Sequence, residues 1–245
     1  MKRETQNILL ILLGGALVKI AVNGDYLRYV KPAQQPWIIT GGAVMVLLGA
    51  VAIVRDLVAS RRAVPDEHEE PDEHEGHAHS ARPAWLLLVP VLAVFLVAPP
   101  ALGADSVIRT EARVPSSAAV ANAAAFPPLP AGNVVPLPVN EFVSRAGWDS
   151  AGTLTGRTVS LTGFVVHTDG STLLARLVIS CCAADAFPVT VRLRGGEADH
   201  LASDAWIQVT GEVVPGTATK DNSYTPDLTP TSVTPVPTPK DPYEY

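Results

Sequence analysis

Cysteine is nearly absent from this sequence: only two of its 245 residues are cysteines, and they are adjacent, at positions 181 and 182. Adjacent cysteines cannot link distant parts of a chain, so a long-range disulfide framework is excluded. Charge is also scarce, at 17% of residues, and the formal net charge is -6. A chain without a basic face has little to offer the phosphates of DNA or RNA, so no nucleic-acid partner is expected.

Recognisable catalytic motifs are missing as well. The sequence contains no Gly-x-Ser-x-Gly elbow, no His-Glu-x-x-His metalloprotease motif and no glycine-rich phosphate-binding loop. Each of these patterns places a nucleophile, a metal or a phosphate in a defined local structure. We therefore predict that the protein is not an enzyme.

Apolar residues, by contrast, are abundant and clustered. A membrane-spanning helix needs about 20 mostly apolar residues, because backbone groups in lipid must be paired within the helix. Two runs of this kind, 8–22 and 37–54, predict two transmembrane helices within residues 1–60, and a third is expected at 84–103. A cleaved signal peptide is the alternative for the first run, but Lys19 and Val22 do not fit the small-residue cleavage pattern.

The positive charges that flank these runs predict how they are oriented. Lysine and arginine accumulate on the cytoplasmic side of short loops. With the N-terminus inside, the cytoplasmic side holds Lys2, Arg3, Arg55, Arg61, Arg62 and Arg82, and the outer side holds Arg28 and Lys31. The sequence thus predicts a multi-pass protein of the plasma membrane with a cytoplasmic N-terminus and an extracytoplasmic C-terminal domain.

Residues 61–83 form an acidic linker in which Pro-Asp-Glu-His-Glu occurs twice, followed by Gly-His-Ala-His. Imidazoles and carboxylates at this spacing can bind a divalent metal, and the candidate ligands are His68, His74, His77 and His79. The alternative, which we favour, is a solvated and disordered cytoplasmic spacer, because closing a chelate on a flexible chain costs conformational entropy.

The remaining sequence predicts a stalk and one β-rich domain. Residues 104–137 are rich in alanine and proline without hydrophobic periodicity, which indicates a semi-rigid stalk. Within 138–245, a helix is expected at 139–148, and alternating apolar residues predict strands near 158–167, 173–180, 189–193, 207–213 and 232–236. A bulge is expected at Gly163. Five short strands favour a small closed barrel of the OB type over an open sandwich.

The most reactive residues of this domain follow its second predicted strand. Cys181 and Cys182 are followed by Asp185. Two thiols at one point can bind a soft or borderline divalent metal such as zinc, or can close a vicinal disulfide, and Asp185 can supply an oxygen ligand. His167 and His200 are the domain's only histidines, and nothing local places them nearby. The alternative is that both cysteines are small, buried apolar residues at a strand end.

Three phrases make the sequence resemble the YcgQ family of bacterial membrane proteins. They are Val178 to Ala186, which contains Cys-Cys-x-x-Asp-Ala, then Trp206 to Gly211, and Pro242 to Tyr245. Paired hydrophobic spans ahead of a variable charged linker extend the resemblance over most of the chain. Members are described as subunits of a two-component permease complex. The resemblance therefore implies a polytopic permease-like membrane partner and a location in the plasma membrane.

These features lead to two functional expectations. The first is a membrane-anchored accessory subunit of a permease complex, whose C-terminal domain binds substrate or braces the partner. Its own spans offer no transport path, because they contain no acidic residue and no inverted repeat. The second is a membrane-tethered thiol-redox or metal-handling protein that uses Cys181 and Cys182. Against the redox form of this idea, the Cys-x-x-Cys spacing is absent.

Overall fold

The computed structural model describes residues 3–62, 89, 92–93, 96, 100–110, 126–168 and 170–245. The chain forms two compact units. The first contains Met1–Tyr26 and Pro32–Pro100, and the second contains Leu27–Lys31 and Ala101–Tyr245. The segment that joins the first two helices is therefore counted with the C-terminal unit.

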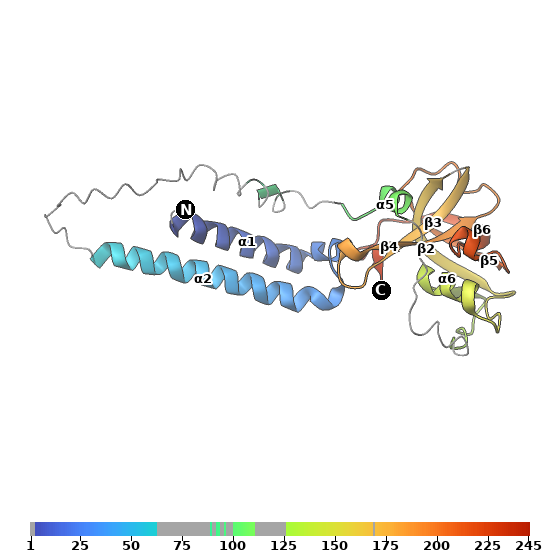
Figure 1. Ribbon diagram of the computed structural model, residues 1–245, viewed down its shortest axis with the longest axis horizontal. Coiled ribbons are helices and arrows are strands. Elements are labelled where there is room, and N and C mark those ends of the chain that lie inside the picture. The colour runs from blue at the N-terminus through green and yellow to red at the C-terminus, as the bar shows by residue number, and fades with distance from the viewer. Residues whose placement is uncertain are drawn as a thin grey trace. The chain divides into compact units, whose positions relative to one another are not determined.

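The first unit is built on two long helices, α1 (Arg3–Asn23) and α2 (Gln35–Arg62), labelled in Figure 1. Both are long and apolar enough to cross a membrane, and they contain the two runs from which spans were predicted. Two short 3-10 turns, η1 (Asp25–Arg28) and η2 (Pro32–Gln34), lie between them in the sequence. Length and apolar composition thus support the helical part of the predicted anchor.

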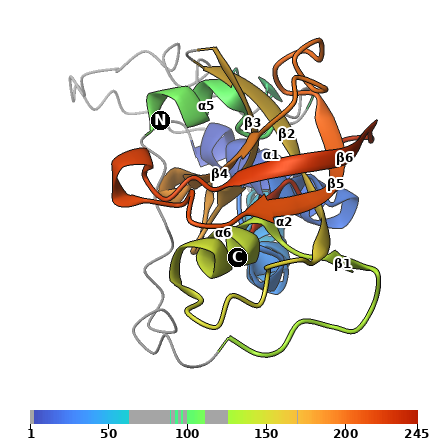
Figure 2. The same cartoon turned by 90° about the vertical axis from the view of Figure 1, so that its right-hand side faces the viewer.

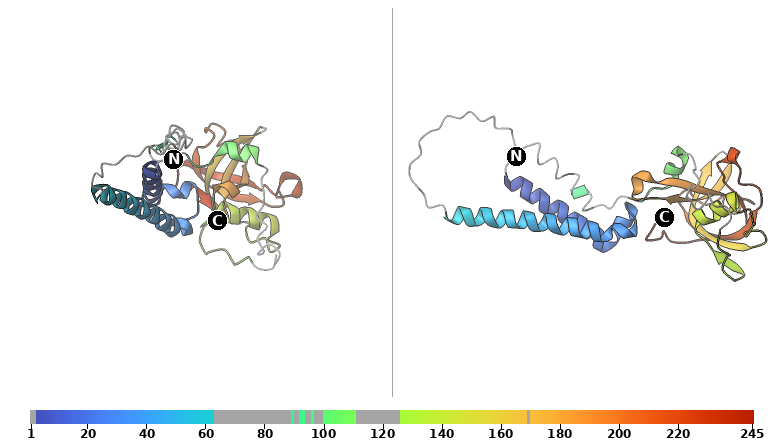
Figure 3. Two further views of the ribbon diagram at one scale, coloured as in Figure 1. Left: turned by 60° about the vertical axis from the view of Figure 1, so that its left-hand side comes forward. Right: turned by 60° about the horizontal axis from the view of Figure 1, so that its bottom comes forward.

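Glycines allow the two helices to approach closely, and Figure 3 shows the helices side by side. A Cβ atom added at Gly14 would lie 2.7 Å from the carbonyl oxygen of Gly42, and one added at Gly42 would lie 2.8 Å from that of Gly14. At Gly49 the obstacle is Ile11, whose Cγ1 would be 2.6 Å away. Small residues that bring backbones together are typical of helix pairs packed in lipid.

The third predicted span falls mostly outside the described residues. Within 84–103, the structure assigns helical backbone to Val89, Leu92, Ala93 and Leu96, which does not amount to a third membrane-spanning helix. The linker histidines His68, His74, His77 and His79 also lie outside the described residues.

Where the structure describes it, the second unit contains a mixed sheet and two α-helices. Its strands are β1 (Val134–Pro136), β2 (Thr158–Thr168), β3 (Ser171–Val178), β4 (Phe187–Leu193), β5 (Trp206–Val214), β6 (Asp227–Pro235) and β7 (Tyr243–Glu244). Its helices are α5 (Ala104–Arg109) and α6 (Val139–Trp148), with 3-10 turns η4 (Ala183–Asp185) and η5 (Lys220–Asn222). The helix predicted at 139–148 and the five predicted strands are confirmed, with boundary shifts of a few residues.

The strand order in the 7-stranded sheet is β1-β2-β5-β6-β4-β3-β7, and β2 also pairs with β3. Strands β2, β5, β6, β4 and β3 therefore form a closed circuit of pairings. Most of these pairings are antiparallel, but β4 and β6 run parallel. The short strands β1 and β7 add in parallel to β2 and β3.

Two clusters of buried side chains lie on the two faces of these strands. The larger one gathers Phe142 of α6 with alternate residues of β2 to β6, such as Val159 and Leu161. The smaller one packs Ala104 and Val107 of α5 against residues that include Phe164. Figure 2 shows α5 and α6 on opposite sides of the strands. Each helix thus covers its own side of the sheet.

The prediction of a stalk at 104–137 is corrected at both ends of this range. Residues 104–137 were expected to be a semi-rigid stalk, but α5 occupies 104–109 and β1 occupies 134–136, and both pack in the C-terminal unit. Ala104 is buried in the second cluster, so an alanine in this alanine-rich segment packs against the sheet. Residues 111–125 of this range lie outside the described residues.

The expected bulge at Gly163 is a second correction. Pairing of β2 with β5 runs through Gly163 without a register shift, whereas β5 and β6 shift register between Thr210 and Gly211. A Cβ atom at Gly163 would lie 2.5 Å from the carbonyl oxygen of Ala175. The glycine is thus required for the close approach of β3.

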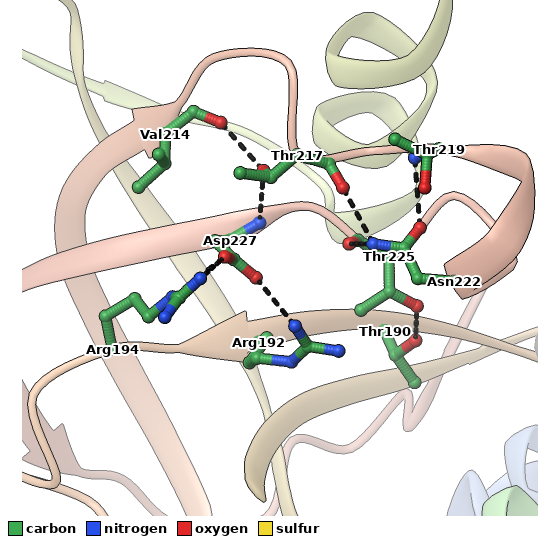
Figure 4. A network of polar contacts seen from close by, with 9 residues as sticks. All are labelled: Thr190, Arg192, Arg194, Val214, Thr217, Thr219, Asn222, Thr225 and Asp227. Carbon is green, nitrogen blue, oxygen red and sulfur yellow. Dashed lines mark hydrogen bonds and ion pairs between the residues drawn. The ribbon is translucent and has the colours of Figure 1, made fainter.

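A polar network connects the end of β4 to the start of β6 (Figure 4). Asp227 is only 1% exposed, and its carboxylate accepts hydrogen bonds from Arg194 and lies 3.5 Å from Nη1 of Arg192. The backbone N–H of Asp227 donates to the Thr217 hydroxyl at 2.9 Å, which in turn donates to the Val214 carbonyl. A buried carboxylate therefore organises the start of β6.

A second buried ion pair anchors β7. Glu244 accepts hydrogen bonds from the backbone N–H groups of Val139 and Asn140, at 2.8 and 2.7 Å, at the N-terminus of α6. Its Oε1 lies 3.4 Å from Nε of Arg176, which is 8% exposed and stacks 4.9 Å from the Trp206 ring centre. Arg176 also donates to the Tyr243 carbonyl at 3.0 Å. These contacts join β3, β7 and α6.

Candidate metal and thiol site

The site lies in the turn between β3 and β4, where the chain passes through η4. Asp185 accepts hydrogen bonds from the backbone N–H groups of Ser180, at 2.9 Å, and Cys181, at 2.8 Å. Because an Asp side chain can bond the backbone a few residues away, this residue both closes the turn and fixes its own carboxylate. The sequence spacing of four residues from Cys181 produces this arrangement.

Both thiols are free, with Cys181 exposed and Cys182 half-buried. Their sulfur atoms are 3.5 Å apart, and the candidate ligand atoms of Cys181, Cys182 and Asp185 all lie within 4.8 Å of one another. Among the residues that the structure describes, no other group of three His, Cys, Asp or Glu side chains meets this condition. The three residues predicted from the sequence are thus brought together.

The distance between the sulfur atoms suits a shared cation. Two thiolates bound tetrahedrally to zinc at about 2.3 Å lie about 3.8 Å from each other. A separation of 3.5 Å therefore requires little movement. Two thiols and one carboxylate supply three ligands and leave a fourth position open for water or a transferred ligand.

The electrostatics of the cluster keep the Cys181 thiol protonated. Hydrogen bonding to Asp185, together with the neighbouring Cys182, raises the pKa of Cys181 to about 11 from its ordinary value of 9.0. Burial acts to raise the pKa of Asp185, but hydrogen bonds from the Cys181 thiol and from the Ser180 and Cys181 backbone outweigh it, so the net shift is downward. The carboxylate is therefore negative, and a bound cation would replace the proton of the Cys181 thiol.

Exchanging Asp185 for asparagine should make Cys181 more reactive. Without the negative carboxylate the pKa of Cys181 falls, and at pH 8 the thiolate fraction should rise roughly tenfold. This factor is smaller than an unscreened charge would produce, because the site is exposed to solvent. The rate of alkylation by a maleimide, followed by mass spectrometry, measures this. The Asp241→Asn variant is the matched control, since Asp241 lies outside the cluster. An unchanged rate in D185N would show that Asp185 does not govern the thiol.

The structure does not bring the domain's histidines to this site. His167 uses one ring nitrogen for the Leu201 carbonyl, at 2.8 Å, and the other for the Thr172 hydroxyl, at 3.2 Å. His200 is exposed. Neither belongs to the cluster around Cys181.

Sequence reasoning missed the neighbours of the site that come from residues 27–31. Ala183, next to Cys182, donates its N–H to the Tyr29 carbonyl at 2.7 Å, and Val30 forms an antiparallel bridge with Cys182. These are backbone contacts between segments more than 150 residues apart. No local sequence pattern in either segment predicts these contacts.

Fold and site together define a class of protein: a pair of apolar helices suited to a membrane, joined to a mixed-sheet domain that presents a vicinal-cysteine site. Comparison with protein families assigns residues 5–111 to the DUF1980 N-terminal domain and residues 149–245 to the DUF1980 C-terminal domain. The two models together cover most of the chain, which therefore belongs to the DUF1980 family. No curated protein and no solved structure matches the chain.

Proposed function

We propose that the protein is a membrane-anchored metal-handling subunit, which captures a soft or borderline divalent cation such as Zn²⁺ on behalf of a transport complex. The observation that carries this proposal is the convergence of Cys181, Cys182 and Asp185 around one point, with the carboxylate already fixed by backbone hydrogen bonds. Preorganised ligands lower the entropic cost of binding.

Metal handling is favoured over thiol-disulfide exchange. A redox cysteine works as a thiolate, and its pKa is usually lowered by a positive charge or a helix N-terminus. Here the neighbouring carboxylate raises the pKa of Cys181 to about 11. A divalent cation reverses this balance, because it binds the thiolates and the carboxylate together.

The proposed membrane arrangement follows from chain connectivity. Segment Leu27–Lys31 belongs to the same compact unit as Ala101–Tyr245, so the loop between α1 and α2 and the C-terminal domain share one side of the membrane. With α2 as a membrane span, this placement favours one further crossing between Arg62 and Ala101 as part of the proposed arrangement. This supports the third span expected at 84–103. With the lysine and arginine distribution, it supports a plasma-membrane protein whose N-terminus and histidine-rich linker are cytoplasmic and whose domain is extracytoplasmic.

The domain itself is proposed to be a small OB-like barrel. The circuit of pairings β2-β5-β6-β4-β3 supports this proposal, because the OB fold is a five-stranded Greek-key barrel. A closed circuit leaves few exposed edges. In this arrangement the cysteine turn connects β3 to β4.

The transport partner is proposed to be a polytopic permease-like membrane protein. Apolar side chains of α2 remain exposed in the described structure, among them Leu47, Leu48, Val51, Val54 and Leu57. They provide a surface for lipid or for the spans of such a partner. The role of this chain is then that of an accessory subunit that delivers or receives the cation.

Cadmium binding tests the proposed function, because cadmium thiolates absorb in the near ultraviolet. The purified full chain in detergent should show this absorption on addition of Cd²⁺, and Zn²⁺ should compete for the site. The double variant Cys181→Ser/Cys182→Ser should lose the absorption entirely, whereas His200→Asn, outside the cluster, should retain it. Wild-type protein that binds neither ion at micromolar concentration would overturn the proposal.

A further inference from the structure

The segment Leu27–Lys31 lies directly against the cation ligands. The Ala183 N–H donates to the Tyr29 carbonyl at 2.7 Å, and Val30 is bridged to Cys182. Cys182 is one of the three candidate ligands, so its main chain contacts this segment while its side chain faces the cluster. A shift of the ligand turn must therefore be followed by the segment, unless these contacts break.

Further contacts hold the same segment in place. The Tyr243 hydroxyl donates to the Arg28 carbonyl at 3.0 Å and accepts the N–H of Leu102 at 3.2 Å. Nζ of Lys31 lies 5.9 Å from the centre of the Tyr245 ring. Tyr243 belongs to β7, which pairs with the last residues of β3, just before the cysteine turn. The segment is thus fixed from two directions by elements that flank the site.

The segment is also the connection between the two apolar helices. η1 (Asp25–Arg28) follows α1, and η2 (Pro32–Gln34) leads into α2. Leu27–Lys31 is therefore covalently continuous with both helices.

We propose that Leu27–Lys31 responds to the occupancy of the cation site: binding at Cys181, Cys182 and Asp185 orders this segment, which connects α1 to α2. The inference rests on the proposed metal-handling function and adds a mode of regulation to it. When the cation binds, it holds the three ligand side chains at one point. The turn that carries Cys182 and Ala183 then loses freedom, and so does the segment bonded to it.

Linkage makes the coupling reciprocal. If the cation stabilises the bound arrangement of Leu27–Lys31, loss of that arrangement weakens cation binding by the same factor, typically about 5- to 150-fold. Removing a contact between the segment and the turn should therefore lower cation affinity, although no ligand is touched.

Ala183→Pro removes one such contact selectively. Ala183 is the first residue of η4, where proline is tolerated, and Cys182 before it has φ −154° and ψ 167°, the extended conformation that proline prefers in its predecessor. The substitution deletes the N–H that bonds Tyr29 and leaves all three ligands in place. Ala183→Ser keeps the N–H and is the matched control. Tyr243→Phe removes the hydroxyl bond to Arg28 from the other direction.

Trypsin cleavage after Arg28 reports on the segment, because the next basic residue, Lys31, precedes a proline and resists cleavage. In the full chain, saturating Cd²⁺ should slow cleavage of the Arg28–Tyr29 bond at least about 5-fold, with cleavage after Lys220 as internal reference. A183S should behave as wild type. A183P and Y243F should bind Cd²⁺ more weakly and lose most of the protection.

The outcomes separate the two proposals. Cadmium binding with an unchanged rate of cleavage after Arg28 would overturn the coupling and leave the metal-handling function intact. Full protection in both A183P and Y243F would also overturn it. Absence of cadmium absorption in wild-type protein would overturn the proposed function and the coupling with it.

Discussion

Replacing both Arg192 and Arg194 with methionine should destabilise the C-terminal unit by about 3–5 kcal/mol, because it leaves the Asp227 carboxylate buried without a cation. Asp227 is 1% exposed, whereas the two arginine side chains are 35% and 56% exposed. The members of the network are therefore not equivalent: an arginine freed from its partner can reach water, but the carboxylate cannot.

This asymmetry sharpens the test. Adding Asp227→Asn to the double variant should recover more than half of the lost stability, since no charge is then left buried. Arg109→Met is the matched control: its ion pair with Asp105 is 76% and 74% exposed, so its removal should cost less than about 1 kcal/mol. Urea unfolding of the full chain, followed by tryptophan fluorescence, measures all three. A loss below about 1 kcal/mol in the double variant would contradict the account.

Substituting Glu244 with alanine is expected to cost about 4 kcal/mol, since it leaves Arg176 buried without its carboxylate and two N-terminal amides of α6 without acceptors. The pair Arg176→Met/Glu244→Gln should be more stable than E244A, because it buries no unpaired charge. A thermal melt of the full chain in detergent compares them. An E244A variant as stable as the double variant would show that the ion pair is dispensable.

The pH dependence of wild-type stability is a second test of the role of Glu244. Burial raises the pKa of this carboxyl, opposed by the Asn140 N–H, the Arg176 charge and the Val139 N–H. Burial likewise lowers the pKa of Arg176, against the attraction of Glu244. The folded state therefore holds the Glu244 proton more tightly than the unfolded chain. The protonated Glu244 therefore contributes fully to the free energy of unfolding below pH 4.5, and this contribution is lost as the pH rises through the pKa that Glu244 has in the folded protein. The Glu244→Gln variant should not show this pH dependence.

Local sequence patterns were sufficient to predict many of the helices and strands. Alternation in Val189, Val191 and Leu193 marked β4, and the apolar runs marked α1 and α2, because one buried face or an entirely apolar surface leaves a periodic signal. The three candidate ligands were also visible, since Asp185 lies within reach of Cys181 along the turn.

Contacts between residues far apart in the sequence could not be predicted from local patterns. Gly163 suggested a bulge, but its actual role is to admit the carbonyl of Ala175 on the neighbouring strand. Helix α5 was hidden in an alanine-rich composition, and its packing depends on a partner surface formed by β2 and β3. The same holds for Tyr29 and Val30, whose backbone contacts carry no side-chain signature.

The parallel pairing of β7 with β3 has a consequence for how the protein is made. Tyr243 and Glu244 pair with Leu177 and Val178, and the Tyr243 hydroxyl reaches Arg28, 215 residues earlier. During synthesis, strands β2 to β6 leave the ribosome before the element that caps α6 exists. The domain therefore completes its structure only after residue 244 has been synthesised.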